Sequence, residues 1–495
     1  MQENQKKTAT EDSQSSSCSQ ALLGKQKEHE EAPTPTPTST TSIGKKLPLI
    51  PLIFLIYFEV SGGPYGQEIA VGAAGPFFAI LGLIVFPIMW SIPEALVTAE
   101  LATTFPSNGG FVIWAHEAFG PFWGHLTGSW KFFGGVINLA SYPALCIQYL
   151  DVAFPVLSSG LPHKFAIFVS TTILSLINYS GITIVGYAAV ALGIVSLFPF
   201  LALSIVAIPQ IDPSKWVIMG QKGRNKKWKL FFHTLFSNLN SLDNVSTLAA
   251  EVKKPYKTFP KALIIAIFFT VISCIIPMAA SVGSISLDLD DWINGYYADI
   301  AEDIAGKWLR SWIEFGAVVS SLGLFQAQLS SSSYQLLGMA DLGLLPSVFG
   351  VRSTRFNTPW VGISISSALA LSISYMNFEN VISSVVHLYS MGMLLEFSSF
   401  LWLRLKFPAV ERPFKIPIGT RGVAAMCSIP SVFLLYVLFV ANGTQFLVSG
   451  SLTVFGIAVY FVLKLLRKKK LLHFNNVGRK LVDEHHLGYY DEIVK

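Results

Sequence analysis

The chain has 495 residues, of which 52% are hydrophobic, 13% aromatic and only 13% charged. Soluble globular proteins carry about 25% charged residues. The composition therefore excludes an ordinary soluble protein and indicates a polytopic membrane protein. The net charge of +5 does not indicate nucleic-acid binding, because the basic residues form short blocks beside apolar segments, where membrane topology accounts for them. The four cysteines are scattered singly, so neither a disulfide framework nor a metal site is expected.

The N-terminal segment, residues 1–46, is rich in Ser, Thr, Gln, Lys and Glu and contains a Pro-Thr repeat at 33–37. Such a segment buries too little apolar surface to offset the entropy of ordering, so we expect a disordered cytoplasmic tail. It has no apolar h-region, so a cleaved secretory signal is not expected. Residues 47–467 are predicted to form the membrane domain, and residues 468–495 a cytoplasmic C-terminal tail.

Twelve apolar stretches of about 17 residues or more recur from residue 47 onward, the length that a helix needs to cross a hydrocarbon core of about 30 Å. The predicted fold class is therefore an all-α membrane protein with twelve transmembrane helices. The predicted spans are 48–72, 77–103, 122–154, 164–180, 184–209, 230–250, 261–283, 311–339, 360–376, 379–406, 424–441 and 445–466.

The distribution of Lys and Arg indicates which side of the membrane holds the termini. With an inner N-terminus, basic residues cluster in the predicted inner segments at 45–46, 253–257, 352–355, 412–421 and 467–470. The loop at 215–229 is an exception, since it is basic but predicted to lie outside, whereas the other large outer loop, 288–303, is acidic. We therefore expect both termini in the cytoplasm.

Two of the predicted spans are interrupted. The first contains Ser61-Gly-Gly-Pro-Tyr-Gly66, and the sixth carries six polar residues between Ser237 and Asn244. Proline and glycine break a helix, and polar backbone at membrane depth is tolerated where it lines a cavity. Breaks at corresponding positions of two halves are typical of transporters that bind their substrate at the midplane. The alternative is that both are packing kinks, because Gly and Ser also allow helices to approach closely.

Acidic residues within the spans greatly outnumber basic ones, with Lys131 as the single comparable base. Ionisable groups at membrane depth are candidate functional residues, and carboxylates attract cations or carry protons. Glu59 precedes the first break and Asp243 lies in the second, while Glu314 and Glu396 have no local basic partner in the sequence.

Aromatic rings can complete an ammonium site through cation-π contacts. The candidates for this role are Tyr65, Tyr142, Tyr149, Phe236, Tyr334 and Tyr389.

Three stretches, 99–110 (AELATTFPSNGG), 251–262 (EVKKPYKTFPKA) and 402–414, resemble motifs of the amino acid, polyamine and organocation superfamily in its L-type branch. The resemblance covers about residues 48–470. The stretch 59–68 (EVSGGPYGQE) looks like that of plant polyamine:proton symporters, some of which also admit the dication paraquat.

The resemblance implies two inverted five-helix repeats with discontinuous helices one and six, plus two extra helices. It places Ser61, Gly62 and Gly63 at the substrate cradle and Asp243 opposite them. Pro64 and the polar run 237–241 depart from the pattern of amino acid transporters, and both departures disfavour an α-amino acid. Glu100 and Glu251 belong to the shared motifs and are interpreted as structural or gating residues.

The hypothesis from the sequence is a secondary transporter that imports putrescine, spermidine and spermine by proton symport through alternating access. The alternatives are a cationic or neutral amino acid transporter, or an amine receptor that does not transport; an enzyme is not expected. The expected partners are polyamine, protons and membrane lipid, without a cofactor, a metal or nucleic acid, and the oligomeric state is left open. The expected location is the plasma membrane, with the ER or Golgi as the alternative. The predicted substrate-binding residues are Glu59, Ser61, Gly62, Gly63, Tyr65, Tyr142, Asn238, Asn240, Asp243, Glu314, Tyr389 and Glu396, with Glu59, Asp243, Glu314 and Glu396 as candidates for proton coupling.

Overall fold

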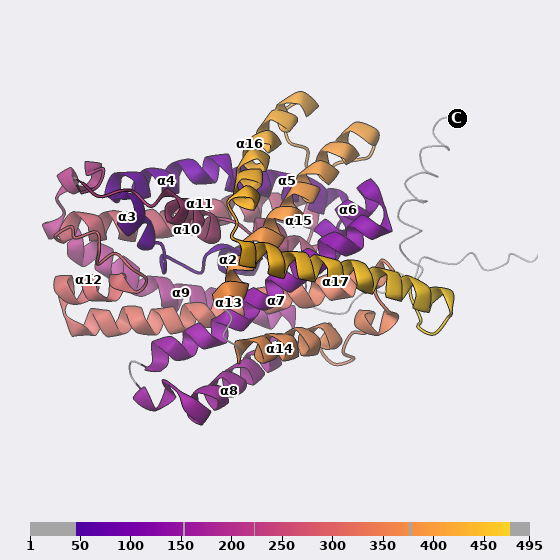
Figure 1. The fold of residues 1–495 in the computed structure, drawn as a ribbon, viewed down its shortest axis with the longest axis horizontal. Helices are drawn as coiled ribbons and strands as arrows, with labels where there is room; N and C mark the ends of the chain where they lie inside the picture. The colour runs from indigo at the N-terminus through magenta and orange to yellow at the C-terminus, as the bar shows by residue number, and fades with distance from the viewer. Residues whose placement is uncertain (1–45, 152–153, 222, 376–378, 476–495) are drawn as a thin grey trace, which may run out of the picture. The chain divides into compact units, whose positions relative to one another are not determined.

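The computed structural model describes residues 46–151, 154–221, 223–375 and 379–475, with the backbone alone at 151 and 379–383. The described part is helical, with one isolated β-bridge between Leu47 and Val252 (Figure 1). The predicted tails, 1–46 and 468–495, lie largely outside the described residues, so their predictions stay untested. The α-helices are α2 (Leu49–Val60), α3 (Ile69–Ala74), α4 (Pro76–Met89), α5 (Ser91–Thr104), α6 (Phe111–Phe119), α7 (Pro121–Asp151), α8 (Gly160–Tyr179), α9 (Ile182–Ala207), α10 (Trp228–Leu239), α11 (Pro255–Ser284), α12 (Tyr296–Ala305), α13 (Lys307–Asp341), α14 (Trp360–Ser374), α15 (Glu379–Lys406), α16 (Thr420–Phe439) and α17 (Gly443–Lys468).

Six helical segments in the described part are long and apolar enough to cross a membrane, as expected for a multi-pass membrane protein. Each of the twelve predicted spans coincides with a helical segment, whereas the short helices α6 and α12 were not predicted. The number of crossings itself stays a prediction. The six segments are Pro76–Thr104, Gly160–Tyr179, Ile182–Gln210, Pro255–Ser284, Thr420–Phe439 and Gly443–Lys468.

Helix α13 packs against both α7 and α9 and contains a run of four serines, 330–333. Their hydroxyls hydrogen-bond largely within the helix; for example, Ser330 donates to the carbonyl of Gln326 at 2.8 Å and Ser333 to that of Leu329 at 2.6 Å. This local bonding takes up the donor capacity of these two hydroxyls, so polar serines are compatible with a buried helix; Ser330 also accepts from the amide of Asn178 on α8 at 2.9 Å.

The first predicted break is confirmed. Helix α2 ends at Val60 and α3 begins at Ile69. Gly62 has a φ of +67°, and a Cβ there would lie 2.8 Å from the hydroxyl oxygen of Ser320 on α13. Glycine is therefore required at this position for both backbone conformation and close approach.

The second predicted break is confirmed as well. Helix α10 ends at Leu239, and the chain resumes as a 3₁₀ segment, η4 (Leu242–Glu251), rather than as an α-helix. Between them Ser241 has a φ of +72°, which is strained for a residue with a Cβ. Strained backbone of this kind persists where the surrounding structure holds it, often at functional sites.

The long loops gather at two ends of the helical bundle, with α3 and α12 toward one end in Figure 1 and α6 toward the other. At the α12 end the basic and acidic loops predicted to lie outside meet, since Arg224 pairs with Asp290 at 2.8 Å. Lys215 also donates to the carbonyl of Ile285 at 2.8 Å. The opposed charges of the two loops explain how a basic loop can lie at this end.

Candidate functional site

The centre of the site is a buried ion pair between Lys131 on α7 and Asp243 on η4. Both side chains are almost fully buried. The ammonium of Lys131 lies 3.9 Å from the ring centroid of Tyr389 on α15 and 5.2 Å from that of Phe111 on α6. Cation-π attraction of this kind strengthens as the cation is desolvated. The site therefore holds a primary ammonium between a carboxylate and aromatic faces.

Glu94 on α5 joins the second break to this centre. Its Oε1 accepts a hydrogen bond from the backbone N–H of Asp243 at 3.2 Å and from the hydroxyl of Tyr389 at 2.8 Å. The Tyr389 hydroxyl in turn accepts from the N–H of the strained Ser241 at 3.0 Å. These bonds tie α5 and α15 to the break. A change in the charge of Glu94 would therefore act directly on the backbone of η4 at Asp243.

Glu396, two helical turns after Tyr389 on α15, completes the cluster. It is fully buried, and neither carboxylate oxygen has a hydrogen-bond partner among the described residues. Its charge interacts with Asp243, Lys131 and Glu94. Three carboxylates thus share one ammonium in a dehydrated interior, where uncompensated charge is costly.

Glu59, the predicted carboxylate before the first break, lies against the second break. Its Oε2 accepts from the amide of Asn244 at 3.1 Å, while its Oε1 has no partner in the described part of the chain. Glu59 is therefore buried next to both discontinuities, with one oxygen that has no hydrogen bond of normal length.

The predicted cradle residues are held by one bond within the first break and one bond from α13. The Ser61 hydroxyl donates to the carbonyl of Gly63 at 2.7 Å, and the carbonyl of Gly62 accepts from Ser320 at 2.7 Å. Tyr65 points toward α9 and α13, where its hydroxyl is within 3.3 Å of the carbonyl of Ser196 and 3.2 Å of that of Ile313.

The polar residues predicted from span six differ in their surroundings. The amide of Asn238 donates within α10 to the carbonyl of Thr234 at 2.9 Å. Asn240 is buried and accepts from the hydroxyl of Ser241 at 2.7 Å. Tyr142 is half-buried on α7, packed against the core. Of these three, Asn240 lies next to the strained residue of the break.

The expectation that Glu314 has no local basic partner is wrong. Its Oε1 lies 3.0 Å from Nε of Arg310, one turn earlier on α13. Arg310 also pairs with Glu302 at 2.6 Å and Asp299 at 2.9 Å, at the α12 end. Side chains three or four residues apart on a helix are neighbours, so the sequence contained the signal for this pair. Glu314 is thus separate from the cluster around Lys131.

Two ionisable residues of the cluster were not among the predicted site residues. Lys131 was noted only as the single intramembrane base, and Glu94 was not selected. The imbalance of charge was the signal for Lys131, because one base among several buried carboxylates must pair with one of them. Nothing in the sequence indicated that Glu94 would reach the break in span six.

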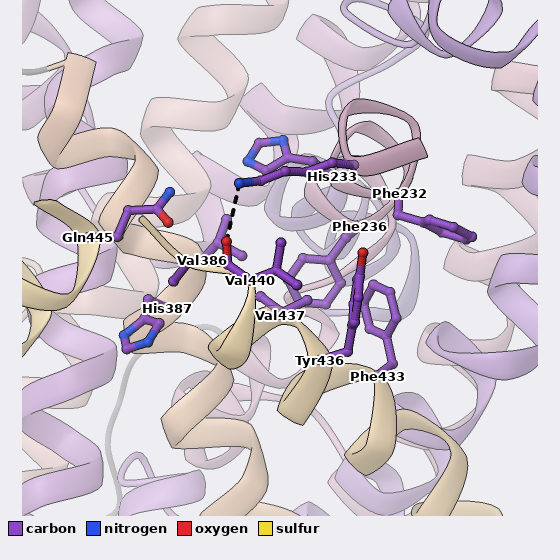
Figure 2. Close-up of a pocket in the computed structure, with 12 residues that line it drawn as sticks. Phe232, His233, Phe236, Val386, His387, Phe433, Tyr436, Val437, Val440 and Gln445 are labelled. Carbon is purple, nitrogen blue, oxygen red and sulfur yellow. Dashed lines mark hydrogen bonds between the residues drawn. The ribbon is translucent and has the colours of Figure 1, made fainter. Parts of the chain in front are cut away.

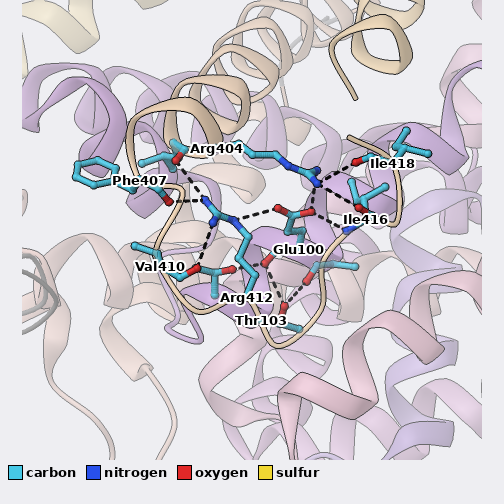
Figure 3. A network of polar contacts seen from close by, with 11 residues as sticks. Glu100, Thr103, Arg404, Phe407, Val410, Arg412, Ile416 and Ile418 are labelled. Atoms are coloured by element: carbon cyan, nitrogen blue, oxygen red, sulfur yellow. Dashed lines mark hydrogen bonds and ion pairs between the residues drawn. The ribbon is translucent and has the colours of Figure 1, made fainter. Parts of the chain in front are cut away.

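Glu100, a residue of the shared motifs at the α6 end, forms ion pairs with two arginines. Oε2 of Glu100 accepts from Arg404 at 3.2 Å and from the N–H of Ile416 at 2.9 Å, and its Oε1 lies 3.1 Å from Nε of Arg412 (Figure 3). These contacts of Glu100 link α15 and the loop that follows it to α5. This geometry fits the interpretation of Glu100 as a structural residue.

Glu251 at the end of η4 is also paired. Its Oε1 accepts from Arg352 at 2.7 Å and from the amide of Asn108 at 2.9 Å. Burial acts to lower the pKa of Arg352, but the charge and hydrogen bond of Glu251 outweigh it, and the pKa is raised.

A separate apolar cavity lies between α10, α15 and α16 (Figure 2). Phe236 lines it and packs edge-to-face on Tyr389, with ring centroids 5.8 Å apart. At its rim Lys229 donates to the carbonyl of Val440 at 3.2 Å. The cavity has no carboxylate in its lining, so it is unlike the cluster around Lys131.

Comparison with known proteins identifies the family of the chain. Residues 49–463 match the family model described as amino acid permease. The chain belongs to the amino acid permease family. It is 47% identical to the polyamine transporter RMV1 of Arabidopsis thaliana, over 87% of this chain and 88% of that protein. It is 44% identical to the polyamine transporter PUT1 of Oryza sativa subsp. japonica, over 88% and 81% respectively. A more distant relative, the serine/threonine exchanger SteT of Bacillus subtilis (strain 168), is 24% identical over 66% of this permease and 76% of that protein.

Proposed function

We propose that this permease imports polyamines such as putrescine, spermidine and spermine by proton symport. The observation that carries the proposal is the ammonium of Lys131, held by Asp243 and the ring of Tyr389. A polyamine carries the same primary alkylammonium group, so the chemistry that holds the lysine suits the cargo. Relatives described as polyamine transporters, at 43–47% identity, support the same substrate class.

Cargo binding is assigned to the carboxylates beside the two breaks. Oε2 of Glu59 accepts from Asn244, and the main chain around Ser61 and Gly63 follows it in the first break. Pro64 removes one N–H donor from the first break, which disfavours the carboxylate of an amino acid. An ammonium group on Glu59 and a second one near Asp243 would engage a polyvalent amine.

The coupled proton is assigned to Glu396. Among the candidates, Glu314 is paired with Arg310, Asp243 with Lys131, and Glu59 accepts from Asn244. Glu396 alone among these four makes no hydrogen bond of normal length through either oxygen in the described part of the chain, and its neighbour Asp243 would accept the proton of a protonated Glu396. A proton on Glu396 would remove one uncompensated charge from the cluster, which favours passage of the loaded protein through a dehydrated state.

The topology we propose has twelve crossings, two inverted five-helix repeats plus two extra helices, and both termini in the cytoplasm. The paired breaks at 61–66 and 240–241 support inverted repeats. The α12 end would then face outward and the α6 end inward. With this orientation in the plasma membrane, an inside-negative potential contributes about 2.3 kcal/mol per charge per 100 mV to cation uptake.

The experiment is uptake of radiolabelled spermidine into proteoliposomes, with and without an inward proton gradient and with unlabelled competitors. We expect uptake that the gradient accelerates and that putrescine and spermine inhibit. Stronger inhibition by leucine or arginine would instead indicate an amino acid transporter. Binding of spermidine without any uptake would indicate a receptor.

A further inference from the structure

A cavity of about 420 Å³ opens at the α12 end, next to the first break. Its lining combines acidic side chains with tyrosines from several elements. Glu68 precedes α3, Asp290 and Asp291 lie in the loop before α12, and Asp299 and Glu314 lie on α12 and α13. The aromatic lining residues are Tyr65, Tyr149, Tyr296 and Tyr297.

Glu68 distinguishes this cavity from an ordinary acidic surface. Its side chain is 1% exposed, yet it lines the cavity. Its Oε1 accepts from the N–H of Gly295 at 2.7 Å, whereas its Oε2 has no hydrogen-bond partner among the described residues. A buried carboxylate oxygen without a partner is costly, and a cationic ligand would satisfy it.

The charge of the cavity is negative even after its ion pairs are counted. Five carboxylates line it with one guanidinium, that of Arg310, and Arg224 pairs with Asp290. Partial burial and the acidic residues around it, Asp291 foremost, raise the pKa of the Tyr296 phenol, as a negative field requires. The cavity therefore attracts cations.

We propose that this cavity is an outer subsite that holds a terminal ammonium of an incoming polyamine before the cargo passes the first break. The tyrosines in the lining favour an organic ammonium over a metal ion, because they offer cation-π faces. The described residues contain no group of three His, Cys, Asp or Glu that could hold a metal. The first break thus separates two buried glutamates, Glu59 before it and Glu68 after it, each with one unpartnered oxygen.

This inference rests on the proposed function, and binding of radiolabelled spermidine to the purified full-length protein in nanodiscs tests both. We expect Glu59→Gln to weaken binding of spermidine at the central site beside Glu59 and Asp243 and to retain its binding at the outer subsite. The double variant Glu59→Gln/Glu68→Gln should lose that remaining binding. Asp303→Asn, in an exposed residue of the same α12 segment outside the cavity lining, is the charge-matched control.

Uptake supplies the second readout. Glu68→Gln should raise the KM for spermidine by about five- to tenfold with kcat within about twofold. The increase should persist at 0.15 M salt, where the Debye length is about 8 Å, because the contact is buried. Asp291→Asn should show a smaller increase in the same direction, and because Asp291 is exposed this variant tests the subsite even if Glu68→Gln fails to fold.

The outcomes separate the two claims. If Glu68→Gln and Asp291→Asn match Asp303→Asn in KM, and the double variant binds as Glu59→Gln does, the outer subsite is overturned while the proposed function stands. If the wild-type protein neither binds nor takes up spermidine, the proposed function fails and the subsite fails with it.

Discussion

Two buried glutamates of this permease, Glu100 and Glu396, differ in the groups that surround them. Both are 0% exposed. Glu100 is matched by two guanidinium groups and a backbone N–H, whereas Glu396 has no hydrogen-bond partner in the described part of the chain. Burial alone therefore does not indicate a role; the partners of the buried group do.

The largest effect is expected at Glu100. Replacing Glu100 by Gln leaves the buried guanidinium groups of Arg404 and Arg412 without a counter-charge, and removing one partner of a buried ion pair costs about 3–5 kcal/mol. We expect a large fall in thermal unfolding temperature or in the yield of folded protein. The control is Glu411→Gln, in an exposed residue of the loop after α15 that also holds Arg412. Equal stability of the two variants would contradict the structural role of Glu100.

The Lys131–Asp243 pair should show strong coupling. Lys131→Met and Asp243→Asn each leave the other charge buried and unpaired, while the double variant removes both charges. We expect the double variant to be more stable than the sum of the single changes by about 1–3 kcal/mol. Additive changes in the free energy of unfolding would show that the two side chains do not interact. Chemical or thermal unfolding in detergent measures the cycle.

A smaller effect on stability is expected at Glu396. Since Glu396 forms no ion pair in the described part of the chain, and its neighbour Asp243 can accept equally from a glutamine amide, Glu396→Gln should change the free energy of unfolding by less than about 1 kcal/mol. The same change at Glu100 should cost several times more. If Glu396→Gln unfolds the protein as Glu100→Gln does, the contrast between the two glutamates is wrong.

The smallest effect is expected at Glu117 on α6, a half-buried glutamate outside the predicted spans. Burial raises its pKa to about 7, and its Oε1 has no partner among the described residues. Because the folded state binds this proton more tightly than the unfolded state does, the residue favours folding at low pH, and this contribution is lost as pH rises toward 7. Glu117→Gln should flatten the dependence of unfolding temperature on pH between about 5 and 8. An unchanged profile would show that Glu117 does not titrate in this range.

Much of the helical arrangement could be predicted because apolar length and helix breakers are local signals. The runs at 61–66 and 237–244 indicated both discontinuities, and each predicted span falls on a helix. The helices α6 and α12 were missed because they have only 9 and 10 residues, too few for the apolar length that predicts a membrane span. The 3₁₀ form of η4 was also missed, since no local pattern separates it from an α-helix.

The site could be predicted only in part, because pairing between distant segments is not a local property. Glu59, Asp243 and Glu396 were selected from their positions in the spans, yet the pairing of Asp243 with Lys131 joins residues 112 positions apart. Glu94 reaches the second break across 149 positions. The pair of Glu314 with Arg310 is the exception, since its four-residue spacing was visible in the sequence.

The most direct test of the account measures initial spermidine uptake into proteoliposomes at a clamped membrane potential while the inward proton gradient is varied, in the wild type and in Glu396→Gln. The account predicts that the gradient accelerates uptake by the wild type and has no effect on Glu396→Gln, which should remain folded. A wild type that ignores the gradient would contradict proton symport, and a Glu396→Gln variant that still responds to the gradient would contradict the assignment of the coupled proton to Glu396.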